Sequence, residues 1–230
     1  MGVIDKLLKF AGKENFQLDP EIGGGYILRQ CYKYGTMLLR GIFFSFGYKN
    51  ITSKIFVGKK VKVIEKRRIK IGDKTKLLDG VYIDALSRDG VLLGNHVVIG
   101  RDTRIECTGG LQYVGKGVKI GNRSTFGNNC LFGAAGGIDI GEDVVAGQFI
   151  RFHSENHSYN DISKLIREQG VTHKGIKIGN NCWIGSGAVF LDGAEIGDGC
   201  VVGANAVVTK KFPSNVVLAG IPAKIIGYRK

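Results

Sequence analysis

The sequence repeats every six residues from Ile178 to Pro213. The fifth position of the first five units is always Ala or Cys, and glycine is the second residue in four of the six units. Glycine lets the backbone turn where a branched side chain would strain it. The first position of every unit is a large apolar residue: Ile178, Ile184, Phe190, Ile196, Val202 and Val208.

This period predicts a solenoid in which each unit supplies one short strand and one corner. Three units close a coil of about 18 residues, and stacked coils form parallel sheets around a continuous core. The same phase occurs upstream, so we predict a mainly β fold with a β-helix over residues 60–212 and an inserted loop at 153–175. The upstream units begin at Ile71, Leu93, Ile99, Ile120, Phe126, Phe132 and Ile140.

The ends of the chain lack the repeat, so residues 1–59 are predicted as a helical or irregular arm and 213–230 as a short tail. Apolar residues of the arm approximate helical spacing. Such an arm can cap the open end of a solenoid or lie on a membrane surface. We favour capping, because aromatic and basic residues are mixed along the arm: Ile27, Cys31, Tyr34, Met37, Leu38 and Ile42 carry the spacing.

Charge and cysteine content restrict the environment. Residues 1–70 hold 15 Lys or Arg and five acidic residues, a net charge of +10 out of +13 for the chain. A basic arm can bind nucleic acid, anionic lipid or a phosphorylated ligand; we expect no nucleic acid partner.

Five cysteines without a CxxC pair indicate buried free thiols in a reducing compartment. We therefore expect a cytoplasmic protein, with peripheral membrane contact through the arm left open.

The motifs IGNNCWIGSGA and VVTKKFPSNVVLAGIPAKIIG resemble those of the hexapeptide-repeat acetyltransferases, including the galactoside, maltose and surface polysaccharide O-acetyltransferases. The resemblance covers about residues 60–227 and implies a left-handed β-helix, a homotrimer with clefts between subunits, and acetyl-coenzyme A as cosubstrate. It implies no metal. No P-loop or Rossmann fingerprint is present, so nucleotide hydrolysis and hydride transfer lack support.

The resemblance also implies a histidine base in the inserted loop, because acetyl transfer to a hydroxyl requires removal of its proton. The family's Asn-His element matches His157 best, with His153 as second choice. Glu155 is expected to orient the imidazole or to bind a sugar hydroxyl. Asn128 and Asn129 match a position that contacts the acceptor, although Asn is also a common corner residue.

Further matching residues are expected around the cosubstrate and the acceptor. Trp183 walls the site in the family, and it can equally pack against a neighbouring subunit. Ser186 matches a serine near the thioester, where backbone amides can stabilise an oxyanion. Small residues leave a groove for the pantetheine arm, and basic residues suit the phosphates of coenzyme A. The expected cosubstrate residues are Gly185, Ser186, Gly203, Ala204, Thr209, Lys210, Lys211, Pro222, Lys224 and Arg229.

The leading hypothesis is transfer of an acetyl group from acetyl-coenzyme A to a hydroxyl of a saccharide, in a surface polysaccharide or its precursor. N-acetylation of an amino sugar, free or nucleotide-linked, is the near alternative. A zinc-dependent carbonic anhydrase of the γ class would need three imidazoles around one metal, and two of the three candidates, His153, His157 and His173, share one loop. A non-catalytic solenoid would leave the histidine, the tryptophan and the basic tail without a role.

Overall fold

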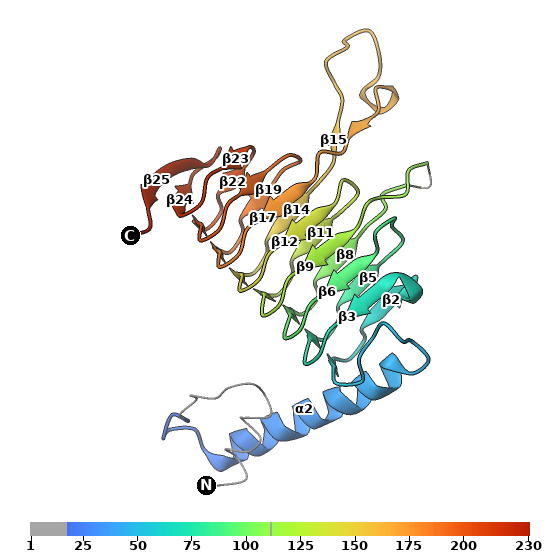
Figure 1. Ribbon diagram of the computed structural model, residues 1–230, viewed down its shortest axis with the longest axis vertical. Coiled ribbons are helices and arrows are strands. Elements are labelled where there is room, and N and C mark those ends of the chain that lie inside the picture. The colour runs from blue at the N-terminus through green and yellow to red at the C-terminus, as the bar shows by residue number, and fades with distance from the viewer. Residues whose placement is uncertain (1–17, 111) are drawn as a thin grey trace.

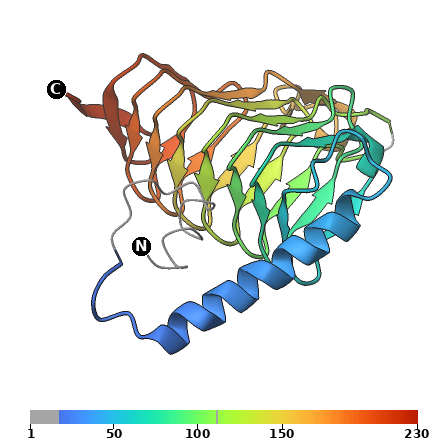
Figure 2. The ribbon, with the colours of Figure 1, turned by 60° about the horizontal axis from the view of Figure 1, so that its bottom comes forward.

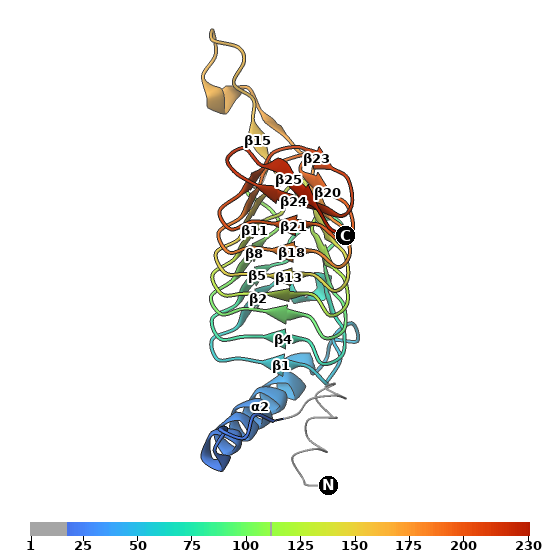
Figure 3. The ribbon, with the colours of Figure 1, turned by 90° about the vertical axis from the view of Figure 1, so that its left-hand side faces the viewer.

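The computed structural model describes residues 18–110 and 112–230, and the part of the predicted arm at 1–17 lies outside them. Its main body is a three-sided parallel β-helix, so the predicted fold is confirmed (Figures 1 and 3). Each coil contributes one strand to each face in turn. We name the corners in chain order: the first corner joins the first and second faces, the second corner the second and third, and the third corner the third and first.

The strands of each face pair in parallel, apart from the final strand of the first face. The first face contains β1 (Phe56–Val57), β4 (Lys76–Leu77), β7 (Val98–Ile99), β10 (Thr125–Phe126), β13 (Val145–Ala146), β18 (Trp183–Ile184), β21 (Val201–Val202), β24 (Val216–Ala219) and antiparallel β25 (Lys224–Tyr228). The second face contains β2 (Lys62–Ile64), β5 (Tyr82–Asp84), β8 (Arg104–Glu106), β11 (Leu131–Gly133), β14 (Arg151–His153), β19 (Val189–Phe190) and β22 (Val207–Val208). The third face contains β3 (Ile69–Ile71), β6 (Val91–Leu93), β9 (Val118–Ile120), β12 (Ile138–Ile140), β17 (Ile176–Ile178), β20 (Glu195–Ile196) and β23 (Lys211–Phe212).

The core is a set of identical positions stacked along the axis. All six predicted inward residues from Ile178 to Val208 are buried, as are the five small residues at the fifth positions. In register, Phe152 lies between Phe132 and Phe190, with ring centroids 4.8 and 5.1 Å apart. The side chains between inward residues point outward, which is why Asp139 is exposed between two buried isoleucines. The six-residue period therefore builds one continuous apolar column.

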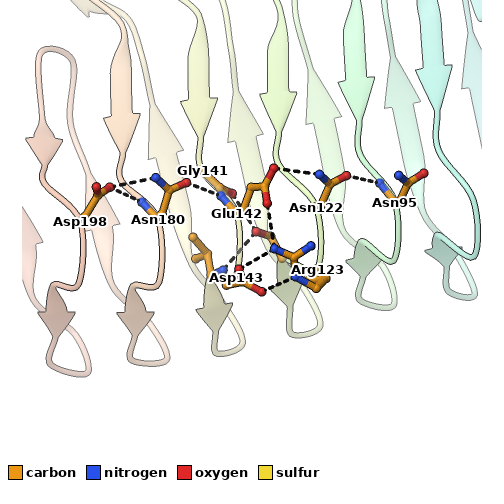
Figure 4. A network of polar contacts seen from close by, with 10 residues as sticks. Asn95, Asn122, Arg123, Gly141, Glu142, Asp143, Asn180 and Asp198 are labelled. Carbon is orange, nitrogen blue, oxygen red and sulfur yellow. Dashed lines mark hydrogen bonds and ion pairs between the residues drawn. The ribbon is translucent and has the colours of Figure 1, made fainter. Parts of the chain in front are cut away.

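Polar side chains bond each coil to the next at the third corner (Figure 4). The side-chain carbonyl of Asn122 accepts the backbone N–H of Asn95 at 2.8 Å, and its amide donates to Glu142 at 2.8 Å. The side chain of Asn180 accepts the N–H of Glu142 at 2.8 Å, and the backbone N–H of Asn180 donates to the carboxylate of Asp198 at 2.6 Å. These contacts satisfy backbone donors that the strands leave unpaired at the corner.

The coils extend beyond the predicted boundaries of residues 60 and 212. Ile51 already bridges Ile71 of the next coil, and β24 continues the first face to Ala219. The six-residue phase is irregular over residues 77–92, but the solenoid continues there, because β5 pairs in register with β2 and β6 with β3. Extra residues are placed in the second corner, where they leave the stacked strands undisturbed.

The N-terminal arm contains one long helix in its described part, α2 (Gly24–Ser45), which lies across the first coil (Figure 2). Its C-terminal half buries Met37, Gly41 and Ser45. A side chain at Gly41 would overlap the backbone carbonyl of Ile55, so only glycine permits this approach. The Arg40 Nε donates to the carbonyl of Val57 at 2.8 Å. This half of α2 therefore caps the solenoid.

Four of the five cysteines lie in the core, and burial raises the pKa of the Cys107 thiol to about 12. The prediction of buried thiols is wrong for Cys31, which is exposed on α2. Helical spacing alone could not show which side of the arm faces the coils. No helix in the described part is long and apolar enough to cross a membrane.

Replacing Phe152 by Ala removes the middle ring of the buried stack, and we expect a loss of about 3–5 kcal/mol in the free energy of unfolding. Urea denaturation measures it. The matched control is Phe149→Ala, because Phe149 lies at a corner and is 50% exposed. Equal losses in the two variants would contradict the stacked-column account.

The partly buried His96 at the third corner predicts a pH dependence of stability. Desolvation, with Lys74, Lys76 and Arg123 nearby, lowers the pKa of His96 below its ordinary value near 6.5. The unfolded chain then binds more protons than the folded chain, so this contribution to stability is complete above about pH 6.5 and is lost as the pH falls through the lower folded pKa.

His96→Asn removes the titration and keeps a residue suited to the left-handed backbone, which Asn181 also adopts at this corner. We expect the urea midpoint to fall less between pH 8 and pH 5 in this variant than in the wild type. An identical fall would show that His96 does not contribute.

Candidate active site

The inserted loop leaves the solenoid at the second corner, between β14 and β17, and projects away from the prism (Figure 1). Its root is a two-stranded antiparallel ribbon of β15 (Asn156–His157) and β16 (Val171–Thr172), in which His157 pairs with Val171. A short 3₁₀ helix, η2 (Ile166–Glu168), lies nearer its tip. The loop thus places both candidate histidines at the edge of the prism.

The two candidate bases occupy different environments. His157 is exposed on the ribbon. His153 ends β14, beside Gly133 of the coil below, and is partly buried. Desolvation, followed by the charge of Arg151, lowers the pKa of His153 from its ordinary value near 6.5. The His153 imidazole is therefore neutral at pH 7, as a proton acceptor must be.

Glu155 contacts neither candidate base through a hydrogen bond that the structure shows. Its carboxylate lies 2.7 Å from Nε2 of His173, and the ring of Tyr113 stacks on the same imidazole at 4.2 Å between centroids. The guanidinium of Arg88 lies over the other ring, 5.0 Å from the centroid of Tyr113. Glu155 and His173 thus join the two ends of the loop, and Tyr113 connects them to the second corner two coils below.

Asp192 fixes the return of the loop to the third face. Its carboxylate is buried, and it accepts the N–H of Gly175 at 2.8 Å and the hydroxyl of Thr172 at 3.0 Å. The sequence analysis missed Asp192, and it considered His173 only as a metal ligand. A polar residue within a hexad unit is the signal that could have indicated Asp192, whereas the ring that stacks on His173, Tyr113, comes from a corner far away in the sequence.

A basic depression of about 500 Å³ opens beside the loop, at the second corner. Three of the predicted cosubstrate residues line it, together with two lysines that the sequence analysis did not single out. The Nζ of Lys211 is 2.8 Å from Glu195, so part of this charge is already paired. The lining cations are Lys174, Lys177, Lys210 and Lys211, and Thr209 also lines the depression.

The other predicted residues lie on a different edge. Asn128, Asn129, Gly185, Ser186, Gly203 and Ala204 belong to the first corner, between strands of the first and second faces. Asn128 accepts the N–H of Arg101 at 2.9 Å, and Ser186 accepts that of Gln148 at 3.2 Å, so both side chains bond adjacent coils. Asn129 has a φ of 57° and serves the left-handed turn. Within one chain these residues are separated from His157 by the second face.

Trp183 and the C-terminal tail lie on the first face and at its C-terminal end. Trp183 lies on the first face between Val145 and Val201, with 60% of its surface exposed. Pro222 lies in the turn before β25, and Lys224 pairs with Ala219 at the start of that strand. Arg229 donates to the carbonyl of Gly199 at 2.9 Å and thereby fastens the tail to the third corner.

Across the described ranges, no group of three or more His, Cys, Asp or Glu side chains is arranged to hold a metal ion. His173, one of the three imidazoles that a zinc site would need, is engaged by Glu155 and Tyr113.

Comparison with known proteins connects this architecture to transferases. Residues 175–210 match the family described as bacterial transferase hexapeptide (six repeats). A predicted acetyltransferase of Dictyostelium discoideum is 49% identical over 90 residues, which are 39% of this chain and 46% of the relative. Galactoside O-acetyltransferase of Escherichia coli is 31% identical over 90 residues, 39% of this chain and 43% of the relative. The matches thus span about half the length of these curated relatives.

Solved structures show the same fold. AntD, an N-acyltransferase of Bacillus cereus solved with dTDP and 3-hydroxybutyryl-CoA, superposes with a TM-score of 0.51 at 15% identity, covering 83% of this chain and 88% of AntD. This likeness concerns the arrangement of the coils.

Asp192→Ala leaves the Gly175 amide without its acceptor, so we expect a stability loss of about 1–3 kcal/mol and faster hydrogen exchange at Gly175. Asp192→Asn keeps one carbonyl acceptor and is expected to retain most of the protection. Hydrogen exchange by mass spectrometry measures both. Unchanged exchange in the alanine variant would show that Asp192 does not anchor the loop.

Proposed function

We propose that the chain is a hexapeptide-repeat transferase, as the match over residues 175–210 supports, and that it moves an acetyl group from acetyl-coenzyme A to a hydroxyl group of a saccharide. The observation that carries the proposal is the histidine-bearing loop at the second corner, beside a depression lined by four lysines. Curated relatives named as acetyltransferases, one of them a galactoside O-acetyltransferase, support the reaction class.

His157 is the proposed general base. An alcohol is a poor nucleophile, so a neutral imidazole must take its proton as the oxygen attacks the thioester carbonyl. The tetrahedral intermediate then collapses, the C–S bond breaks, and the imidazolium returns its proton to the coenzyme A sulfur. The exposure of His157 at the root of the loop leaves its ring accessible to an acceptor. His153, held neutral by burial, is the second choice.

The lysines around the depression are the proposed contacts of the coenzyme A phosphates. Pyrophosphate and 3′-phosphate groups are recognised by clustered cations. Lys174 and Lys177 come from the end of the loop and β17, and Lys210 comes from the segment before β23, so their charges line the same depression. In this proposal, Thr209 and Lys211 complete the lining.

The positions of the remaining residues support assembly into a homotrimer. The glycine-lined first corner, with Ser186, and the loop with His157 lie on different edges of one prism. They can form one cleft only if the second corner of one chain faces the first corner or first face of its neighbour. Trp183 and Val145, 60% and 58% exposed on the first face, supply an apolar surface for that contact.

The acceptor is the finer part of the proposal. A hydroxyl of a surface polysaccharide or its precursor is the leading class, and an amino sugar is the alternative that the N-acyltransferase AntD illustrates. Both acceptors need the same base and the same thioester, so assays with acetyl-coenzyme A and each acceptor class separate them.

We expect His157→Ala to lower kcat by roughly 10²–10⁴ because the base is lost. Coenzyme A should still raise the melting temperature of this variant, since ligand bound to the folded state stabilises it. The matched control is His96→Asn, which removes a histidine far from the loop and should retain activity. Full activity of His157→Ala with loss in His153→Ala would move the role to His153.

A further inference from the structure

We propose that the outer face of α2 binds the surface of a bilayer containing anionic lipid. The helix has two apolar sides. One side is the buried set around Gly41, which caps the first coil. The other, which we call the apolar stripe, is exposed and consists of Leu28 (72% exposed), Tyr32 (75%), Leu39 (58%), Phe43 (79%) and Phe46 (86%).

The stripe follows a single side of the helix. Its members are separated by four, seven, four and three residues, spacings that return to the same side at about 100° per residue. Gly35 and Ile42 fall within the same sector, so no charged residue interrupts it. Scattered exposed apolar residues are ordinary on a protein surface, whereas a continuous exposed row marks an interaction site.

The direction of the stripe disfavours a neighbouring prism as its occupant. Met37, Gly41 and Ser45 face the first coil, and the stripe lies on the roughly opposite side of the helix. It therefore faces away from the stack, along the axis of the solenoid, at the end where α2 crosses the first coil (Figures 1 and 3). Prisms packed side by side with parallel axes would leave this surface uncovered.

The surrounding charge identifies the partner. From Ile22 to Ile64 the sequence contains eight Lys or Arg and no acidic residue. Arg29 and Lys33 directly follow Leu28 and Tyr32 in the helix, and Lys49 lies three residues after Phe46. A helix that buries an apolar face at the headgroup level and carries cations beside it binds anionic membrane surfaces. Tyr32 suits that depth, because its ring is apolar and its hydroxyl is polar.

The length of the helix agrees with a position in the plane of the membrane. Its 22 residues extend roughly 33 Å, yet none of the described helices is long and apolar enough to span. The stripe therefore lies on the surface, with the prism held above it. This inference is independent of the proposed acetyl transfer, because it uses no residue of the loop or of the depression.

Co-sedimentation of the full chain with vesicles tests the proposal. We expect binding to phosphatidylcholine vesicles that contain phosphatidylglycerol, weaker binding in high salt, and little binding to phosphatidylcholine alone. Leu39→Gln with Phe43→Gln should lower the partition coefficient by about tenfold or more. The matched control, Ile162→Gln with Leu165→Gln, changes two exposed apolar residues of the inserted loop and should leave binding unchanged.

Arg29→Gln with Lys33→Gln tests the electrostatic part and should lower binding to the anionic vesicles by about tenfold. Its control is Lys164→Gln with Arg167→Gln on the inserted loop. Equal effects of the two pairs would indicate attraction of the whole positive chain to the vesicle, and that result would overturn the assignment to α2. Circular dichroism spectra confirm that each variant is folded.

Cys31 reports on the same sector in the unmodified protein, since it is exposed and the other four cysteines are buried. A maleimide should modify it rapidly in buffer and more slowly when anionic vesicles are present. Slow modification in buffer alone would mean that another segment or a second copy already covers the stripe. A change of oligomeric state in the Leu39, Phe43 variant, measured by sedimentation velocity, would assign the face to self-association. Either result, or an absence of vesicle binding, would overturn the proposal.

Discussion

The structure depends on the stacking of equivalent positions from coil to coil. Each inward residue is covered by its counterpart above and below, as Phe152 is by Phe132 and Phe190. At the third corner, side chains such as Asn122 and Asn180 join neighbouring coils by accepting backbone N–H groups of the preceding coil. Because both sets recur with the repeat, each coil gains stability mainly from its neighbours, and the two ends require special treatment.

The polar chemistry follows from this constraint. Strand positions are committed to the column, so extra residues are accommodated only at corners, and the longest insertion begins after His153 and carries His157. The insertion is held at its base by Asp192 and by the pair of Glu155 and His173. A rigid prism thus presents a loop with an anchored root, which is the arrangement expected where a reacting group must be positioned.

The N-terminal end of the prism is finished differently from the C-terminal end. At the C-terminus, β25 folds back antiparallel onto β24 and Arg229 ties it to Gly199. At the N-terminus, α2 covers the first coil with one side and exposes a second apolar side to its surroundings. Capping of the first coil requires only one apolar side of the helix, so the second apolar side indicates an additional contact. The excess of basic residues around it favours an anionic surface as the partner.

The sequence by itself determined the β-helix, its inward residues and the place of the insertion. A large apolar residue at every sixth position is buried when three six-residue units close one coil and the coils stack. Through its resemblance to a known family, it also offered His157 and His153 as candidate bases. The tertiary structure decided the rest. It showed that Glu155 meets His173, that Asn128 and Ser186 bond neighbouring coils, and that Cys31 is exposed. These contacts join residues from different coils or depend on the rotation of a helix about its axis, and neither can be read from spacing along the chain.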